Sequence, residues 1–404
     1  MWIEHTFIVV LLFLILQLSS CSENMNPKAL SSAVATFSAK FINELDKTKS
    51  SVSSPLSAEF VLALIALGTS GKAHEELLSS LGFPDDNTIR SAFTRVSSML
   101  KSIKGVTLDV ANKVYVMEGG YDLQAPIKED AVNIFDAAFE IVNFAENVKA
   151  ANIINSWVEG KTNKRIKDLI QPDDLNAYSR LVLVNAIYFK GTWKTKFDVN
   201  NTSNQPFYLS KSSTIDIPMM YREDNYKFGF SEELQAQLLQ MDYIGDEASM
   251  LIVLPNEVDG LNTVLEKLAA GHNLMSDVEK MHSNKVRVTI PKFKIETEID
   301  LGNLLPKLGI KSIFNENNSG LTKLLNADEP LYVSKAIQKA FIEVNEEGAE
   351  AAAATVGAVR MRRCAPQHHE FVANRPALWC ILVGGQIMVG ATYRPTETPR
   401  RDEL

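Results

Sequence analysis

The chain has 404 residues, 46% of them hydrophobic and 22% charged, so it can bury a large core. Its formal net charge of −8 argues against non-specific binding of nucleic acid. No Pro-, Gly- or Ser-rich linker, long charge run or internal repeat divides the sequence, so we expect one large mixed domain.

The first 22 residues are predicted to be a secretory signal peptide and no part of the fold. The apolar run Phe7–Leu18 is too short to span a bilayer comfortably, and four small residues follow it. Only Glu4 carries a charge before this run, which is unusual for a signal peptide, so a signal anchor is the alternative. No other segment is long and apolar enough to cross a membrane, and we expect no span in the mature chain.

Helix-start signals recur in the first quarter of the sequence. Asn26-Pro27 places a capping side chain before Pro, and apolar residues then recur at helical spacing. Ser54-Pro55 repeats this signal before an apolar segment that ends at Gly68. A further helix is predicted from Ser70 to Leu81, where Gly82 ends it.

The middle of the chain contains a strand and a basic group. The continuous apolar run from Leu181 to Phe189 predicts a strand buried on both faces. Its polar exception is Asn185, and a buried amide needs hydrogen-bond partners. Four cations could contact a polyanion, although a solvated helix end and turn is the preferred interpretation: Lys161, Lys164, Arg165 and Lys167.

The chain carries no recognisable catalytic, cofactor or metal motif. It has no G-x-S-x-G, H-E-x-x-H, P-loop or G-x-G-x-x-G sequence. His368 and His369 are adjacent but would point to opposite faces of a strand, so they make a poor metal pair. We predict no enzyme activity and no cofactor. A hydrolase stays as an alternative, because catalytic triads are assembled from distant positions.

Two cysteines remain after removal of the signal peptide. Cys380 lies in an apolar run and is predicted to be a buried core thiol, whereas Cys364 lies on an expected loop. We therefore predict no disulfide framework, although a secretory compartment would permit one.

The stretch from Glu343 to Arg363 begins with acidic residues around Gly348, continues through very small side chains and ends in R-M-R-R. At strand period, one of its faces has no charge and nothing larger than Val. That face carries Ala349, Ala351, Ala353, Thr355, Gly357 and Val359. Alanine favours helix, but the interspersed Gly, Thr and Val residues weaken one. An exposed loop with latent strand character fits better, and proteases cut such loops.

The segment E-V-N-E-E-G-A-E-A-A-A-A-T resembles the reactive-loop hinge of the serpins, the suicide inhibitors of serine proteases. Other serpin-like motifs follow in family order, among them S-P-L-S, G-T-W, I-P-K-F, L-G-I and A-N-R-P. The resemblance implies a mixed α/β (α+β) serpin fold with three β-sheets, about nine helices and an exposed reactive-centre loop. It places a single, monomeric serpin domain at residues 23–395, with the loop at about 345–370.

The resemblance also implies roles for individual residues. The hinge would comprise Glu347, Gly348, Ala349, Glu350, Ala351, Ala352, Ala353, Ala354 and Thr355. A buried polar cluster under the main sheet would comprise Ser54, Ser57, Asn185 and Gln338. Gln338 stands where the family usually has His, so any pH dependence due to that His should be absent. Residues 154–170 match the helix that lies across the main sheet.

In the mechanism that the resemblance implies, a serine protease attacks the loop and forms an acyl-enzyme. The freed loop then inserts as a new strand into the main sheet and carries the protease with it. Residues 349–363, extended at roughly 3.3 Å each, would span about 50 Å, enough to move a protease from one pole of the domain to the other.

The reactive bond is predicted at Arg363-Cys364, although the commonest loop length of the family would place it after Arg362. Arg360, Arg362 and Arg363 together match the acidic cleft of a furin-like proprotein convertase, which reads Arg at the cut, one residue before it and three before it. An extracellular trypsin-like protease is the alternative target, with Arg362 or Arg363 at the cut. A non-inhibitory serpin acting as a chaperone or binding protein is the alternative of another class.

The sequence also contains candidate signals for glycosylation and for retrieval to the endoplasmic reticulum. Asn200, Asn201 and Asn317 are candidate glycosylation sites, of which the first two overlap. Residues 396–404 form a tail that we expect to be flexible. Its last four residues, Arg401, Asp402, Glu403 and Leu404, resemble the K-D-E-L signal that a retrieval receptor reads. We therefore expect residence in the endoplasmic reticulum and early secretory pathway, with some secretion.

Overall fold

The computed structural model describes residues 27–119, 122–326, 331–347 and 369–396. Its α-helices are α2 (Pro27–Asn43), α3 (Pro55–Leu67), α4 (Gly71–Leu81), α5 (Asp86–Ser102), α6 (Ala125–Asn133), α7 (Asn147–Lys161), α8 (Leu261–Ala269), α9 (Leu274–Val278) and α10 (Leu301–Leu304). Its strands are β1 (Ser51–Ser53), β2 (Val106–Met117), β3 (Asp122–Leu123), β4 (Ala138–Val142), β5 (Leu181–Gly191), β6 (Thr202–Ser210), β7 (Ser213–Ser231), β8 (Ala236–Asp242), β9 (Ala248–Pro255), β10 (His282–Pro291), β11 (Phe293–Asp300), β12 (Leu325–Asn326), β13 (Val333–Val344), β14 (His369–Val372), β15 (Ala377–Val383) and β16 (Gln386–Tyr393). Four 3-10 turns connect them: η1 (Pro172–Asp174), η2 (Val199–Asn201), η3 (Leu305–Leu308) and η4 (Ser312–Phe314).

A five-stranded sheet has the strand order β11-β13-β5-β2-β4. The neighbouring strands β13 and β5 are parallel, with a register that runs from Val333 opposite Leu181 to Ile342 opposite Phe189. β11 pairs antiparallel with β13, and β2 pairs antiparallel with β5. Within the described part of the chain, β5 and β13 are therefore direct hydrogen-bonded neighbours.

The remaining strands form a nine-stranded sheet and a two-stranded sheet. The larger one has the order β1-β16-β15-β9-β8-β7-β10-β14, with β6 paired to β7. β14, the first strand after residue 368, pairs parallel with β10 at one end of that sheet. The predicted mixed fold with three sheets and about nine helices is thus confirmed for the described residues.

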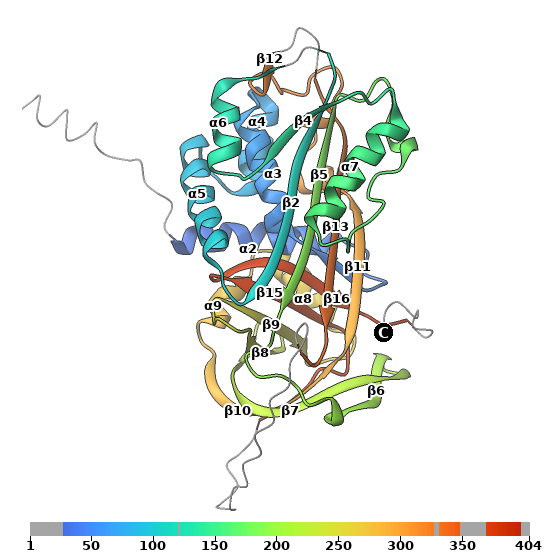
Figure 1. Ribbon diagram of the computed structural model, residues 1–404. Helices are drawn as coiled ribbons and strands as arrows, with labels where there is room; N and C mark the ends of the chain where they lie inside the picture. The colour runs from blue at the N-terminus through green and yellow to red at the C-terminus, as the bar shows by residue number, and fades with distance from the viewer. Residues whose placement is uncertain (1–26, 120–121, 327–330, 348–368, 397–404) are drawn as a thin grey trace, which may run out of the picture.

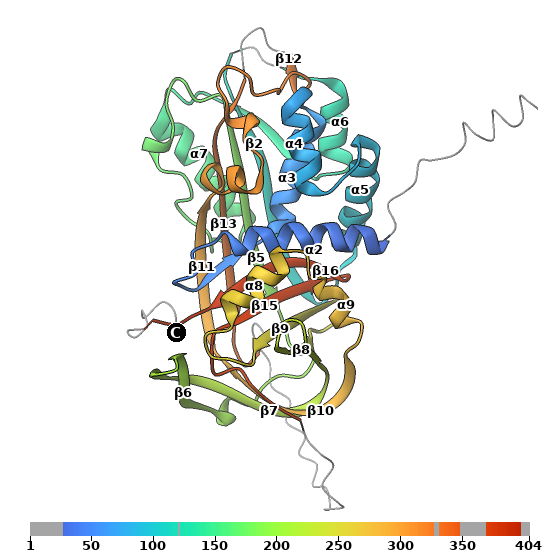
Figure 2. The same cartoon turned by 180° about the vertical axis from the view of Figure 1, so that it is seen from behind.

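Helices cover both faces of the five-stranded sheet. α7 lies diagonally across one face, in front of β5 and β13 in Figure 1. α3 lies behind the opposite face, and α2, α4 and α5 surround it when the molecule is seen from behind (Figure 2). Every residue of α3 is buried, and apart from Ser57 and Glu59 its sequence is apolar on all sides.

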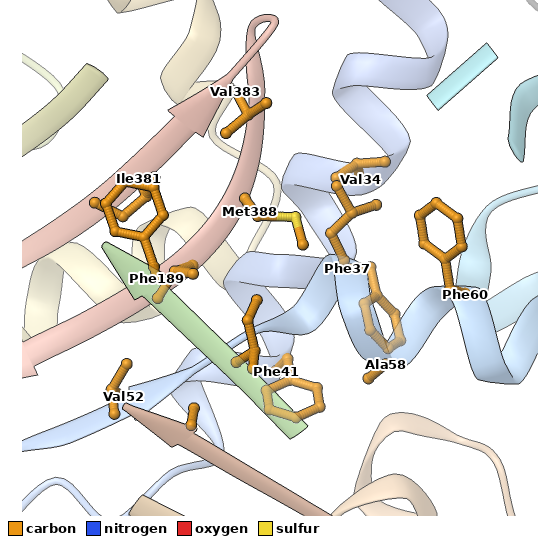
Figure 3. Packing of buried hydrophobic residues seen from close by; sticks show 14 of the residues in the cluster. Val34, Phe37, Phe41, Val52, Ala58, Phe60, Phe189, Ile381, Val383 and Met388 are labelled. Atoms are coloured by element: carbon orange, nitrogen blue, oxygen red, sulfur yellow. The ribbon is translucent and has the colours of Figure 1, made fainter. Parts of the chain in front are cut away.

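The main core lies where α2 and α3 meet the two large sheets. Phe37 and Phe41 of α2 pack beside Ala58 of α3 and Met388 of β16 (Figure 3). Both phenylalanines are at most 2% exposed, and burying one such side chain stabilises the fold by about 1.5–3 kcal/mol. This packing fixes α3, which positions part of the candidate site.

Most of the predicted helix boundaries agree with the structure. Ser54 caps α3, since its side chain accepts a hydrogen bond from the Ser57 amide, and Gly68 follows the end of that helix. Gly82, with φ of 77°, ends α4 as its sequence indicated.

The helix expected over residues 154–170 needs a correction. α7 begins at Asn147 and ends at Lys161, so the second half of the expected segment is not helical. The chain leaves the helix because Asn163 and Lys164 adopt left-handed φ values of 50° and 60°. The following residues return along the sheet toward β5.

The predicted core position of Cys380 agrees with the structure. Cys380 is fully buried, and burial raises the pKa of its thiol to about 12, which agrees with a core position.

Among the residues that the structure describes, none of the helices combines the length and the hydropathy needed to cross a bilayer.

Candidate functional site

The expected reactive loop connects two different sheets. β13 of the five-stranded sheet leads into it, and β14 at the end of the nine-stranded sheet follows it. Of the predicted hinge, Glu347 is described, whereas residues 348–355 lie outside the described residues. So do the predicted reactive bond at Arg363-Cys364, the specificity residues Arg360 and Arg362, and the tail residues 401–404.

Polar contacts hold the chain where it leaves β13. The Glu346 side chain is 6% exposed, and one of its oxygens lies 2.9 Å from Lys292 Nζ. Its other oxygen accepts a hydrogen bond from the Thr202 hydroxyl at 3.0 Å. Burial acts to raise the pKa of this carboxyl, but the bonds from Lys292 and Thr202 bring it below its ordinary value, so it is ionised at neutral pH.

The backbone at the same point bonds to the segment after β5. The Trp193 amide donates to the Glu347 carbonyl at 3.1 Å, and the Phe197 amide donates to the Glu346 carbonyl at 2.9 Å. The Trp193 indole donates to the Asn345 carbonyl at 2.8 Å. Its ring stacks on Tyr243 with centroids 4.6 Å apart. The base of the loop is therefore fastened to the end of β5, next to the junction of β5 and β13.

The structure brings together the four residues expected in a buried polar cluster. Gln338 of β13 lies directly opposite Asn185 of β5, and its amide donates to the Asn185 side-chain oxygen at 2.5 Å. The same Gln338 side chain accepts from the Ser54 amide and donates to the Ser54 carbonyl, both at 2.9 Å. Asn185 in turn donates to the Ser57 hydroxyl at 2.6 Å. The N-terminus of α3 is thus hydrogen-bonded to both β13 and β5.

A fifth member of this cluster, Asn112 of β2, was missed by the sequence analysis. Its side-chain oxygen accepts from the Ser57 hydroxyl at 3.3 Å and from the Asn185 amide. Asn112 lies opposite Asn185 in the β2–β5 register, so three amides form one row across β13, β5 and β2. All five side chains are buried. Separation of β5 from β13 would break the Gln338–Asn185 bond of this row.

The structure also locates the candidate modification and basic residues. Asn200, Asn201 and Asn317 are exposed. The sequon hydroxyls of Thr202 and Ser319 are both occupied, by Glu346 and by the Leu331 carbonyl. The four basic residues of the predicted helix end, Lys161, Lys164, Arg165 and Lys167, are all exposed on α7 and the segment after it.

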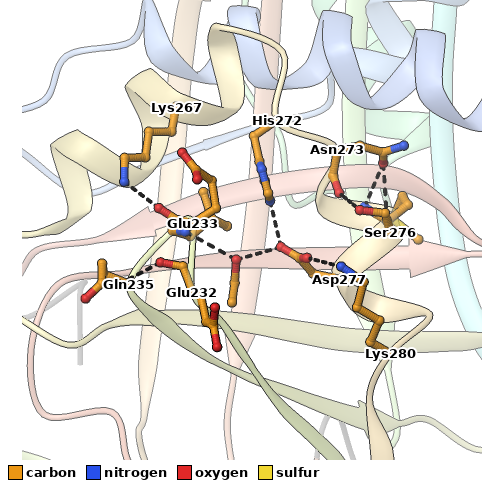
Figure 4. A network of polar contacts seen from close by, with 12 residues as sticks. Glu232, Glu233, Gln235, Lys267, His272, Asn273, Ser276, Asp277 and Lys280 are labelled. Atoms are coloured by element: carbon orange, nitrogen blue, oxygen red, sulfur yellow. Dashed lines mark hydrogen bonds and ion pairs between the residues drawn. The ribbon is translucent and has the colours of Figure 1, made fainter.

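A Ser, His and Asp do meet in the structure, which bears on the hydrolase alternative (Figure 4). Asp277 accepts hydrogen bonds from the Ser231 hydroxyl and from His272 Nε2, each at 2.6 Å. In a catalytic triad the imidazole stands between serine and carboxylate. Here the carboxylate stands in the middle, so His272 cannot take the Ser231 proton. No group of three or more potential metal ligands occurs among the described residues.

Comparisons with known proteins agree on one family. A family model described as Serpin (serine protease inhibitor) matches residues 32–388. Antichymotrypsin-2 of Bombyx mori is 45% identical over 363 residues, which cover 89% of this chain and 96% of that protein. Antitrypsin of Bombyx mori is also 45% identical, over 88% of this chain and 92% of that protein. The crystal structure of Serpin48 from Tenebrio molitor superimposes with a TM-score of 0.81 and 32% identity, covering 92% of this chain and all of that one.

These comparisons correct the basis of one expectation. The chain was predicted not to be an enzyme because catalytic motifs are missing from its sequence. The matched family and both Bombyx relatives are instead named for the inhibition of proteases, and such inhibitors are not catalytic enzymes. The proteins of this family are therefore classified by their inhibition of proteases, and the absence of a catalytic motif is not the basis of that classification.

Proposed function

Because this chain belongs to the serpin family of serine protease inhibitors, we propose that it traps a protease that cleaves after arginine, and that this protease is a furin-like proprotein convertase. The observation that carries the choice of target is the sequence Arg360-Met361-Arg362-Arg363 before Cys364. Three arginines at these spacings complement an acidic convertase cleft, because each guanidinium can bind a carboxylate in a bidentate manner.

The described residues support the inhibitory reaction itself. The parallel pair β5–β13 has nothing between its strands, and the loop base is attached at the end of this pair. The small, uncharged face of residues 349–359 would suit a strand that must be buried on that side. Cleavage after Arg363 would leave the protease acylated at the end of a segment long enough to be inserted here.

An extracellular trypsin-like protease is the second candidate target. It is favoured by the 45% identity to a relative named Antitrypsin. A trypsin-like pocket requires one arginine at the cut, and either Arg362 or Arg363 would supply it. The two candidates differ in whether Arg360 and Arg362 contribute to binding.

We place the inhibition in the endoplasmic reticulum and early secretory pathway. The expected signal peptide and the terminal Arg-Asp-Glu-Leu sequence support this location, and a retrieval receptor is then a further partner. Convertases mature along the same route, so location and target support each other.

The test is a denaturing-gel assay for covalent complex with furin and with trypsin in parallel. We expect a complex with both proteases, and we expect the released C-terminal peptide to begin at Cys364 by mass spectrometry. Arg360→Ala should slow furin trapping by about tenfold or more, since one buried charge-assisted contact of roughly 1.4 kcal/mol is lost, and should leave trypsin trapping nearly unchanged. Absence of a complex with either protease would favour a non-inhibitory serpin. Furin trapping that is unchanged by Arg360→Ala would favour the trypsin-like target.

A further inference from the structure

The underside of α7 packs against both strands that flank the expected insertion site. Ile154 and Val158 of α7 belong to one buried apolar cluster with Val184 of β5 and Ile337 of β13. When a strand inserts between β5 and β13, these two strands move apart. α7 must then lose packing on at least one side, and the strength of its contact with the sheet becomes part of the barrier to insertion.

A lysine lies within this contact. Lys113 of β2 has a side chain that is only 8% exposed. Its ammonium lies 4.7 Å from the ring centroid of Trp157 on α7 and 5.1 Å from that of Tyr115 on β2. Its charged partner is Glu140 of β4, whose side chain is 39% exposed. The charge is therefore held between two aromatic rings and one carboxylate, at the edge of an apolar cluster.

A second polar group lies beside it. The Tyr115 hydroxyl is buried and has no hydrogen-bond partner among the described residues. The Tyr115 ring meets Trp157 edge-on, with centroids 6.3 Å apart. A buried hydroxyl without a partner destabilises the contact in which it lies. The Lys113 charge is likewise removed from water, and burying a charge costs free energy that an apolar side chain of similar size would not cost.

The contact of α7 with the sheet is thus weaker than an apolar contact of the same area would be. A sheet surface that packs against a helix is normally apolar, whereas Lys113 and Tyr115 of β2 place a charge and a hydroxyl group beside Trp157. Local departures from such rules occur where function requires them. We propose that Lys113 is a positioning residue for inhibition: it keeps α7 releasable, so that the loop inserts before the acyl-enzyme is hydrolysed. This proposal rests on the inhibitory reaction proposed above.

The test variants are Lys113→Met and Tyr115→Phe in the full-length chain. Met fills the same space without a charge and contacts both rings well, and Phe removes only the unpartnered hydroxyl. We expect both variants to unfold at higher temperature. We also expect insertion to be about five- to tenfold slower, so that trypsin releases a larger fraction of cleaved protein for each covalent complex formed.

Two control variants separate this role from general stabilisation. Lys113→Arg keeps the charge and the ring contacts and should restore the wild-type ratio of complex to cleaved protein. Glu59→Gln, on α3 at the opposite face of the sheet, should raise the unfolding temperature without changing that ratio. The proposal is overturned if Lys113→Met keeps the wild-type ratio, or if Glu59→Gln shifts the ratio equally.

A further measurement distinguishes failure of this proposal from failure of the proposed function. If the wild type forms no complex with any protease, the inhibitory function is wrong. Insertion is then followed after nicking of the loop, by the rate at which the cleaved protein acquires resistance to urea. Slower acquisition in Lys113→Met would still support the role of Lys113, and an unchanged rate would exclude it.

Discussion

Glu59 is a carboxylic acid in a helix where every residue is buried. It is 0% exposed, and neither oxygen has a hydrogen-bond partner among the described residues. Burial raises the pKa of this carboxyl well above its ordinary value of 4.5, and no charged neighbour contributes. The unfolded chain releases the proton near its ordinary pKa, whereas the folded protein retains it to higher pH. The free energy of unfolding therefore decreases as pH rises above 4.5.

We predict that Glu59→Gln removes this pH dependence. The variant should unfold at a higher temperature than the wild type at pH 7.5, and the difference should shrink as the pH approaches 4.5. Calorimetry across this range measures both effects. A difference that is constant with pH, or a less stable variant at pH 7.5, would show that Glu59 does not hold its proton in the folded protein.

Glu76 provides a control of opposite sign. Burial acts to raise its pKa, but bonds from the Ser312 and Lys311 amides and the Ser312 hydroxyl bring it below 4.5. Its contribution to stability is therefore present above the ordinary pKa and is lost as the pH falls through the folded value. Glu76→Gln should destabilise the protein most at neutral pH.

Asn185 and Asn112 show what single residues reveal about a buried site. Asn185 interrupts a long apolar run, so its burial and its need for partners can be predicted from the sequence. Asn112 makes equivalent contacts, but Lys113 follows it, and the pair resembles the polar part of an ordinary half-exposed strand. Lys113 is itself buried, which no local pattern indicates. Asn112 and Lys113 are buried because α3 and α7 pack against the sheet at these positions.

At the scale of elements, helix starts are predicted well where Ser precedes Pro or Gly, as for α3 and α4, although only the Ser54 side chain makes a capping bond. The end of α7 is not predicted correctly, because the segment after Lys161 keeps apolar residues at intervals that also suit a helix. Ile166, Leu169 and Ile170 are buried, but they lie in an irregular segment that packs into the same cluster as α7. Apolar spacing alone does not distinguish these two arrangements.

The proposed insertion of the loop as a strand leads to a further prediction. Ala351 belongs to the small face that must be buried if residues 349–359 insert between β5 and β13. Ala351→Arg should therefore slow insertion, because an unpaired charge would be buried, and trypsin should yield cleaved protein in place of covalent complex. Glu350→Arg, on the opposite face, is the matched control and should retain the complex. Equal complex yields from Ala351→Arg and the wild type would contradict insertion in this register.

For the whole molecule, the proposed location is testable by deletion of the last four residues. Cells that express the intact chain should retain most of it, and the truncated chain should appear in the medium at several-fold higher amounts. Immunoblots of cell lysate and medium measure the distribution. Equal secretion of both forms would remove the support for the endoplasmic reticulum and make the extracellular trypsin-like target the better proposal.

The parallel pairing of β5 with β13 has a consequence for the direction of the reaction. A segment that follows β13 and folds back beside it runs opposite to β13, and therefore opposite to β5 as well. Insertion would replace one parallel ladder by two antiparallel ladders, whose hydrogen bonds are the better aligned. Reversal would require both ladders to break at once. Each copy of the protein would then act a single time, and protective capacity would depend on the number of copies made.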